Sequence, residues 1–280
     1  MPGSATASAS PHLDGGVSLE LDLLQRALEE ERFVLHYQPI ISLRDGAVTH
    51  HEALVRLRAP NGGGLLAPAA FLPAAERYEL ICGIDRAVLD KALAALSELS
   101  WRPPRLRVRP RAPARSAAVA VNLSALSLTD EHMLGFLEER LTHHSVGGEA
   151  LVLEVTETAS ISDMAAAREF CAGAAALGCE IALDDFGAGF GTFQYLRHLH
   201  FDYLKIDGGF IRGLASSPRD RRVVSSLVAL ARAIGARTIA EYVHDSRTLR
   251  LVRELGVDHA QGFAVGRPRP RARLLLESRS

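Results

Sequence analysis

The sequence predicts a closed α/β barrel of eight strands. Short apolar segments typical of buried strands alternate along the chain with longer segments that carry apolar residues at helical spacing. This alternation indicates a parallel sheet covered by helices, and eight strands in roughly 250 residues suit a barrel. The alternative is an open doubly wound sheet, which is disfavoured because no Gly-x-Gly-x-x-Gly motif follows the first strand.

The N-terminal part is expected to contain a leader, a helix and a β-hairpin. Residues 1–17 are mainly small and polar and lack the charged start and apolar core of a signal peptide, so we expect a disordered leader. Leucines at helical spacing predict a helix over 18–31. Strands are expected over 33–41 and 47–54, and the turn Arg44-Asp45-Gly46 between them makes them antiparallel.

The barrel is expected to extend over residues 18–276, with 277–280 as a short tail. The remaining strands are expected over 118–122, 150–155, 180–184, 202–206, 237–241 and 258–261. The remaining helices are expected over 69–77, 80–99, 128–142, 162–177, 217–235 and 245–255. Two segments rich in Arg and Pro, 101–116 and 266–273, are expected to be solvated loops, because Pro disfavours both helix and strand.

The composition is that of an ordinary globular protein, with 48% hydrophobic residues, 23% charged residues and a formal net charge of −1. Such a charge gives no general attraction to nucleic acid, and no apolar run reaches the roughly 18 residues of a membrane span. The three cysteines form no Cys-x-x-Cys pair. We therefore expect reduced thiols in a cytoplasmic protein that neither inserts into membranes nor binds nucleic acid.

The adjacent carboxylates Asp184 and Asp185 are the most informative feature. They follow the apolar segment Ile181-Ala182-Leu183 and precede the glycine-rich segment 186–191. Like charges held close together raise each other's pKa unless a cation neutralises them. Hard oxygen ligands suit Mg²⁺ or Mn²⁺, so the doublet suggests a metal site.

Polar side chains lie at the end of almost every expected strand. Because the active sites of parallel barrels lie at the carboxyl ends of the strands, these side chains should meet at one mouth. Each has an ordinary explanation when taken alone, such as solvation for Glu52 or capping for Asn122. A core cannot hold so many carboxylates without cations. The residues are Glu52, Asn122, Glu154, Glu157, Asp184, Asp185, Lys205, Glu241 and Gln261.

These residue types indicate metal-assisted phosphodiester cleavage. Carboxylates and an amide without a His or Cys cluster suit two hard divalent cations, which clamp a phosphodiester and activate a water for in-line attack. Lys205, one of only two lysines beside 30 arginines, would orient or deprotonate that water or stabilise phosphate charge. His50 and His51 are interpreted as strand residues rather than zinc ligands.

Several short motifs follow one another along the chain. They are Tyr37-Gln-Pro-Ile40, His51-Glu-Ala-Leu-Val-Arg56, Val121-Asn-Leu-Ser124, Leu153-Glu-Val-Thr-Glu157, Leu183-Asp-Asp-Phe-Gly187, Leu204-Lys-Ile-Asp207, Ala240-Glu241 and Ala260-Gln-Gly262. In this order the chain resembles the EAL-domain family of cyclic di-GMP phosphodiesterases, over about residues 20–275. The resemblance implies a modified triosephosphate-isomerase-type barrel with an antiparallel first strand. It also implies hydrolysis of cyclic di-GMP to linear pGpG with two Mg²⁺ or Mn²⁺ ions.

The resemblance also implies roles for individual residues. One metal ion would be held by Glu52, Asn122, Glu154 and Asp184, and the second by Asp184, Asp185 and, directly or through water, Glu241. The catalytic residues would be Lys205, at the nucleophilic water, with Glu241 and Glu52. Substrate contacts or support would come from Gln38, Leu54, Arg56 and Gln261. Glu157 would anchor the loop 186–192, which resembles a dimer contact in relatives, so a homodimer is expected.

The chain departs from the family pattern at two places. The family often has Ala-Glu-Gly-Val-Glu after the sixth parallel strand, whereas this chain has Ala240-Glu-Tyr-Val-His244. Ala188 replaces a common Thr, and Phe190-Gly191 replace a common Tyr-Ser. A histidine at position 244 would weaken metal or water positioning, or make activity depend on pH near the histidine pKa.

Two rival functions remain open at this point. The first is a catalytically weak or inactive cyclic di-GMP receptor that signals through a protein partner; it is disfavoured because all the acidic ligands are kept. The second is a nucleic-acid binder that uses the arginine-rich segments, whose affinity would fall steeply with salt and would survive loss of the carboxylates.

Overall fold

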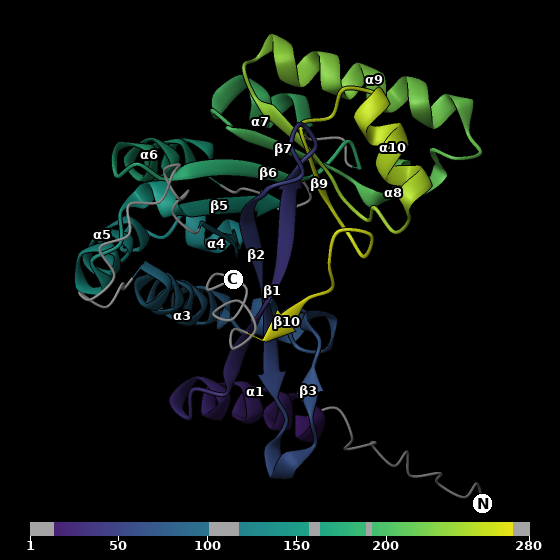
Figure 1. The fold of residues 1–280 in the computed structure, drawn as a ribbon. Coiled ribbons are helices and arrows are strands. Elements are labelled where there is room, and N and C mark those ends of the chain that lie inside the picture. Colours follow the sequence, from purple (N-terminus) through teal and green to yellow (C-terminus); the bar gives the residue numbers. More distant parts are fainter. Residues whose placement is uncertain (1–13, 101–117, 157–162, 189–191, 271–280) are drawn as a thin grey trace, which may run out of the picture.

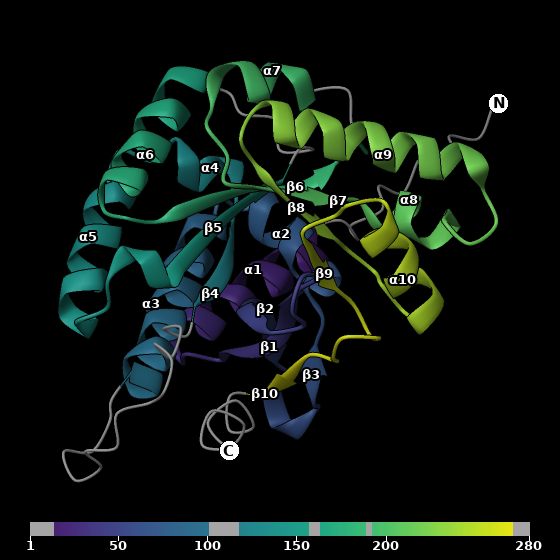
Figure 2. The same cartoon turned by 45° about the horizontal axis from the view of Figure 1, so that its top comes forward.

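The computed structural model describes residues 14–100, 118–156, 163–188 and 192–270. Eight strands close into a barrel (Figure 1 and Figure 2), and the hydrogen-bond pairing runs in the order β1-β9-β8-β7-β6-β5-β4-β2-β1. The strands are β1 (Phe33–Ser42), β2 (Val48–Arg58), β4 (Val119–Leu123), β5 (Leu151–Thr156), β6 (Glu180–Phe186), β7 (Tyr203–Ile206), β8 (Arg237–Ala240) and β9 (His259–Gln261). The predicted barrel is therefore confirmed.

Strand β1 runs against both of its neighbours. It pairs antiparallel with β2 and with β9, whereas the other neighbouring pairs around the barrel are parallel. The expected antiparallel first strand is confirmed, and its cause is the short connection between β1 and β2, which only an antiparallel pair can use. Because β1 runs in the opposite direction, its first half lies at the same mouth of the barrel as the carboxyl ends of the parallel strands.

Helices surround the strands, and Figure 2 shows α3, α5, α6, α7, α9 and α10 arranged around the barrel. The helices are α1 (Asp14–Glu29), α2 (Leu72–Arg77), α3 (Ile81–Ser100), α4 (Ala125–Leu128), α5 (Met133–His144), α6 (Met164–Ala176), α7 (Thr192–His198), α8 (Gly208–Gly213), α9 (Pro218–Ala233) and α10 (Ser246–Glu254). Side-chain oxygens cap several N-termini by accepting backbone N–H bonds, as Asp163, Ser217 and Asp245 do. In the described parts of the chain, no helix is both long and apolar enough to cross a bilayer.

The apolar core has two parts. The larger part fills the space between the strands and the helices, where residues such as Leu89, Leu153 and Val228 are buried. The smaller part fills the inside of the barrel with one residue from each of six strands. These residues are Ile40, Ala120, Val152, Ala182, Tyr203 and Ile239. This interior layer supports the polar residues above it.

Several boundaries differ from the expected ones. Strand β2 continues to Arg58 instead of ending at residue 54, because it pairs with β1 as far as Phe33 opposite Leu57. Glu52 therefore lies in the middle of a strand, not at its end. Helix α1 begins at Asp14, and the helix expected from residue 128 begins at Met133.

Some short elements were not expected. Helices α4, α7 and α8 contain four to seven residues each, which is too short for a helical period to show in the sequence. Two-residue strands, β3 (Leu65–Leu66) and β10 (Arg269–Pro270), pair with β2 and β1. Strand β10 falls inside the segment 266–273 that was expected to be a loop, because the edge of β1 near Tyr37 offers it a partner. The segment 101–116 lies outside the described residues.

Candidate functional site

The polar side chains of the site lie two residues beyond the apolar layer inside the barrel. Side chains i and i+2 of a strand share one face, so a residue placed two positions after an interior residue also points inward. The pairs are Ala120 and Asn122, Val152 and Glu154, Ala182 and Asp184, Tyr203 and Lys205, and Ile239 and Glu241. The carboxylates thus converge because every parallel strand keeps the same inward register.

Lys205 lies at the centre of this cluster and is fully buried. Its Nζ lies 2.7 Å from Glu154 Oε2, 3.0 Å from Asp184 Oδ1 and 3.0 Å from Glu241 Oε1. Glu52 Oε1 is farther away, at 3.8 Å. One ammonium therefore bridges carboxylates from four different strands or strand ends. The sequence analysis expected these carboxylates to meet at one mouth of the barrel.

Amide side chains orient Glu52 from both sides. Asn122 Nδ2 donates a hydrogen bond to Glu52 Oε1 at 2.9 Å, and Gln261 Nε2 donates to Glu52 Oε2. Gln261 Nε2 also lies 3.2 Å from Gln38 Oε1, and Gln38 Nε2 donates to the carbonyl of Gly266 at 2.9 Å. These bonds place Glu52, Asn122, Gln38 and Gln261 in one network with the carboxylates.

The aspartate doublet is held by an irregularity in β6. The pairing of β6 with β7 shifts register between Leu183 and Phe186, and Asp185 has a φ of 55°. In a regular strand, adjacent side chains point to opposite faces, whereas such an irregularity re-aims one of them. As a result Asp184, Asp185 and Glu241 each offer an oxygen within 4.8 Å of the others.

Burial and mutual repulsion shift the pKa values of the cluster. Desolvation raises the pKa of Glu154 well above its ordinary value, although the Lys205 ammonium opposes this shift. Desolvation also raises the pKa of Glu241 to about 8. Burial alone would lower the pKa of Lys205, but the surrounding carboxylates outweigh it and raise this pKa well above the ordinary value. The cluster is therefore richer in carboxylates than one ammonium can neutralise, and it favours further cations.

The donor set suits hard divalent cations. Glu154 Oε1 and Gln261 Oε1 are buried and have no hydrogen-bond partner among the described residues. Buried oxygens without a partner are costly unless another group satisfies them, and a cation does so. Carboxylate and amide oxygens without sulfur or imidazole are the ligands of Mg²⁺ and Mn²⁺ rather than of zinc. These residues therefore fit the metal chemistry that the sequence suggests.

Two of the expected site residues that the structure describes, Leu54 and Arg56, are not joined to this network by a described hydrogen bond or ion pair. Leu54 and Arg56 follow Glu52 on the same face of β2, both half-buried, and Arg56 Nη1 donates to the backbone carbonyl of Val55 at 2.8 Å. Burial lowers the pKa of Arg56, while Glu52 opposes this by its charge. Glu157 lies outside the described residues.

The histidines of β2 lie on that strand, as expected, and His50 points into the barrel below the acidic cluster. The ring centroids of His50 and Tyr203 lie 5.4 Å apart, and the ring centroids of Tyr203 and His259 lie 5.6 Å apart. Burial is the main cause that lowers the pKa of His50 to about 3. His50 is therefore a neutral packing residue of the barrel floor.

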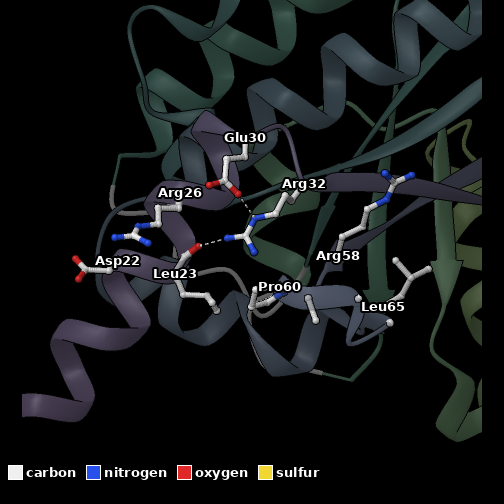
Figure 3. A pocket seen from close by; sticks show the side chains of 11 residues that line it. Asp22, Leu23, Arg26, Glu30, Arg32, Arg58, Pro60 and Leu65 are labelled. Atoms are coloured by element: carbon white, nitrogen blue, oxygen red, sulfur yellow. Dashed lines mark hydrogen bonds and ion pairs between the residues drawn. The ribbon is translucent and has the colours of Figure 1, made fainter.

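The cavity drawn in Figure 3 lies away from the acidic cluster. It has a volume of about 880 Å³ and lies between α1 and the connection from β2 to β3. Arg32 borders it, donating to the carbonyl of Leu23 at 2.9 Å and pairing with Glu30 at 3.2 Å. No residue of the acidic cluster lines this cavity. Cavity size therefore does not locate the chemistry in this molecule.

One feature of the site was missed by sequence reasoning. Tyr242, directly after Glu241, has a φ of 52° and is 58% exposed as a residue. The available signal was the departure from the common Ala-Glu-Gly pattern, because a glycine tolerates this backbone conformation at no steric cost.

Comparisons with known proteins agree with this geometry. The family model described as "EAL domain" matches residues 22–268. The chain is 35% identical over 252 residues to the cyclic di-GMP phosphodiesterase PdeB of Shewanella oneidensis, covering 89% of this chain and 28% of the relative. It is 36% identical to the bifunctional diguanylate cyclase/cyclic di-GMP phosphodiesterase MucR of Pseudomonas aeruginosa, covering 90% of this chain and 35% of the relative. The chain thus spans about a third of the length of these curated relatives.

A solved structure shows the same fold. The PaMucR phosphodiesterase in complex with c-di-GMP superposes with a TM-score of 0.80 at 35% identity, covering 91% of this chain and 99% of that chain. The family match extends over most of the barrel and includes every acidic residue of the cluster. The chain therefore belongs to the EAL domain family.

Proposed function

We propose that this chain hydrolyses cyclic di-GMP to linear pGpG with two divalent cations, Mg²⁺ or Mn²⁺. The observation that carries the proposal is the convergence of carboxylates from separate strands around the buried Lys205 ammonium. The phosphodiesterase names of the relatives and the c-di-GMP in the PaMucR complex support the same substrate. Their longer chains carry further segments, so the proposal concerns the barrel that this chain shares with them.

The proposed metal ligands divide between two positions. Glu52, Asn122, Glu154 and Asp184 would hold one ion, and Asp184, Asp185 and Glu241 the other. When bound, such ions polarise the phosphodiester and lower the pKa of a water that attacks it. The uncompensated carboxylates and the unpartnered oxygen of Glu154 support this assignment.

The protein's own residues prepare the site for this reaction. Lys205 is fixed by three carboxylates within 3.0 Å, so its ammonium is preorganised to orient the attacking water and to stabilise charge on the phosphate. Glu52 is held by Asn122 and Gln261, which keep its carboxylate directed at the centre. Gln38, Leu54 and Arg56 lie at the same mouth and would contact the dinucleotide, with Arg56 at a phosphate.

The test is a metal-dependent hydrolysis assay. Purified protein is incubated with cyclic di-GMP and Mg²⁺ or Mn²⁺, with and without chelator, and pGpG is followed by chromatography. Product should form only with metal and should disappear in Asp184→Asn, which keeps the shape of the side chain but removes its charge. Asp202→Asn serves as the control, because Asp202 lies before β7 and accepts from Ile181 N–H outside the cluster. Metal-independent turnover, or full activity of Asp184→Asn, contradicts the proposal.

The receptor alternative makes a different prediction in the same assay, namely tight binding without product.

The described contacts of His244 favour the enzyme. Its Nε2 lies 3.2 Å from Asp245 Oδ2 and its Nδ1 lies 3.3 Å from the carbonyl of Tyr242, and its side chain is half exposed. None of these partners belongs to the acidic cluster, so the replacement of a common Glu by His244 leaves the described ligands in place.

We also propose that the active form is a homodimer, as the likeness of the loop 186–192 to a dimer contact suggests. Residues 189–191 of this loop lie outside the described residues. Light scattering at several protein concentrations tests the dimer directly. A strictly monomeric protein with full activity removes the dimer from the proposal but leaves the chemistry of the barrel intact.

A further inference from the structure

Tyr242 stands at the rim of the barrel mouth in a conformation that side chains rarely adopt. It directly follows Glu241, whose Oε1 lies 3.0 Å from Lys205 Nζ. Its φ of 52° lies in the left-handed region, which is unfavourable for an aromatic residue. The residue is 58% exposed, so it gains little from burial. Folding alone therefore gives no reason for a tyrosine at this position.

The neighbours of Tyr242 are adapted to its ring. A Cβ atom on Gly208 would lie 2.1 Å from Cδ2 of Tyr242, so only a glycine fits beneath the ring. The guanidinium carbon of Arg212 lies 4.6 Å from the ring centroid, within range of a cation–π contact. Both residues belong to α8, which begins three residues after Lys205. The ring is thus fixed over the junction of β7 and α8.

The backbone on the other side of Tyr242 is also fixed. The N–H of Val243 donates to the carbonyl of Gln261 at 2.9 Å, and the N–H of Ala264 donates to the carbonyl of Val243 at 2.9 Å. These bonds tie the segment after β8 to the end of β9 and to the segment that follows it. A rigid and exposed aromatic ring on the residue directly after Glu241 is suited to stacking, because little conformational entropy is lost when a ligand binds.

We infer that Tyr242 stacks on a nucleobase of the bound dinucleotide and is a specificity-determining residue of this chain. The inference rests on the proposed function, because that function supplies a substrate with two guanine bases close to the reacting phosphates. Aromatic side chains bind bases through their π-faces, and a guanidinium on the ring adds to this attraction. Arg212 thereby supports the ring, and Gly208 makes the space that the ring needs.

The test compares Tyr242→Gly with Tyr242→Phe. Glycine accepts a φ of 52° without strain, so Tyr242→Gly should fold and melt at the same temperature as the unmodified protein or higher. Without the ring, KM for cyclic di-GMP should rise roughly 10- to 100-fold, with kcat within about threefold. Tyr242→Phe keeps the ring and should leave KM within about threefold.

Ser145→Gly is the matched control. Ser145 has a φ of 54° at the end of α5, so the substitution relieves the same backbone conformation without touching the mouth. Its KM should not change. A spectroscopic measurement adds a readout that does not depend on turnover: a cyclic dinucleotide with 2-aminopurine in place of one guanine should lose fluorescence on binding. The loss should persist in Tyr242→Phe and diminish in Tyr242→Gly.

The outcomes separate this inference from the proposed function. If the unmodified protein neither binds nor hydrolyses cyclic di-GMP, the proposed function fails and the inference fails with it. If it does both, and Tyr242→Gly shows the same KM and the same fluorescence change, the inference alone is overturned. A changed oligomeric state with unchanged KM also overturns it, because the ring then belongs to an interface between copies of the chain.

Discussion

Lys205 shows how a single buried charge can organise a site. Its neighbours Glu154, Asp184 and Glu241 come from three different strands or strand ends, and each lies within 3.0 Å of its ammonium. A buried ammonium is unfavourable without such partners, and the carboxylates are equally unfavourable without it. We therefore expect Lys205 to contribute both to the folding of the mouth and to the proposed chemistry.

Replacing Lys205 by methionine tests both roles. Lys205→Met should abolish almost all hydrolysis while cyclic di-GMP still binds, because the ammonium orients the attacking water. In chelator it should also lower the free energy of unfolding by about 3–5 kcal/mol, since the buried carboxylates lose their counter-charge. Product chromatography, binding titration and urea unfolding measure these three effects.

The other lysine of the chain provides the control for this prediction. Lys91 forms a surface ion pair with Glu31, whose side chain is 80% exposed, at 3.1 Å. Pairs of this kind contribute little, so Lys91→Met should change the free energy of unfolding by less than about 1 kcal/mol and leave activity intact. An unchanged rate in Lys205→Met removes Lys205 from the mechanism.

At the level of elements, long apolar strands could be predicted from sequence and short connecting elements could not. The eight barrel strands were expected from short, mostly apolar segments that alternate with helical segments, although β9 (His259–Gln261) contains one apolar residue. Helix α8 begins Gly208-Gly209 and lasts six residues, so its sequence carries no helical signal. It forms because Asp207 caps it by accepting from the N–H of Gly209, and because β7 ends there.

The candidate site could likewise be predicted in part, namely where its residues lie at the ends of expected strands. The sequence analysis expected polar side chains at the ends of the parallel strands to meet at one mouth, and the structure brings Glu154 and Asp184 within 3.0 Å of Lys205 Nζ. The joint participation of Asp184 and Asp185 could not be derived that way, since neighbours on a regular strand face opposite sides. It depends on the irregular pairing of β6 with β7, which is set by tertiary packing.

A buried carboxylate on α3 holds the start of α4, directly after Asn122. Asp85 is 6% exposed, and its Oδ2 accepts from Ser124 N–H at 2.9 Å and from the Ser127 hydroxyl at 2.7 Å. Asp85→Ala should cost about 2–3 kcal/mol in the free energy of unfolding, because two donors lose their acceptor. Urea unfolding measures this change.

Asp90 on the same helix is the comparison for Asp85. Its side chain is 42% exposed and pairs with His144 at 2.8 Å. Asp90→Ala should therefore cost less than about 1 kcal/mol. Equal losses for the two variants would show that the Asp85 hydrogen bonds do not stabilise the junction of α3 and α4.

Burial of two thiols at and after α6 predicts a loss of stability in alkali. Burial raises the pKa of Cys171 to about 11, and burial followed by the charge of Glu149 raises that of Cys179 to about 12. The unfolded chain loses these protons near pH 8.5–9, whereas the folded protein keeps them. The unfolded state then binds fewer protons, so stability is complete below this range and falls as pH rises toward 11.

The expected size of this loss is up to about 1.4 kcal/mol per pH unit and thiol. Urea unfolding at pH 8, 9, 10 and 11 should show a shallower decline in a Cys171→Ala, Cys179→Ala double variant. Tyr203, whose pKa is also raised by burial, adds a slope of the same sign in both proteins. Parallel curves for the double variant and the unmodified protein would contradict the assignment.

For the whole molecule, the closed barrel is what makes an acidic mouth possible. Strand β1 closes the sheet by pairing with β2 on one side and β9 on the other, so Gln38 reaches Gln261 and Gln261 reaches Glu52. An open sheet would leave these side chains on separate edges. Closure was predicted from strand number and chain length, but the additional pairing of β10 with β1 was not.

Metal binding should consequently stabilise the entire barrel. The cluster joins β2, β4, β5 and β6 with the ends of β7 and β8, so an ion held there binds the folded state and has no equivalent site in the unfolded chain. At a free concentration of one hundred times Kd, a single ion adds about 2.7 kcal/mol, which corresponds to roughly 5–10 °C in Tm for a domain of this size. Thermal unfolding in chelator, Mg²⁺ and Mn²⁺ measures the shift. A Glu154→Gln, Asp184→Asn double variant should lose most of the metal-induced shift in Tm. The Asp90→Ala variant should keep this shift. If metal raised Tm equally in both variants, the ion would lie outside the acidic mouth.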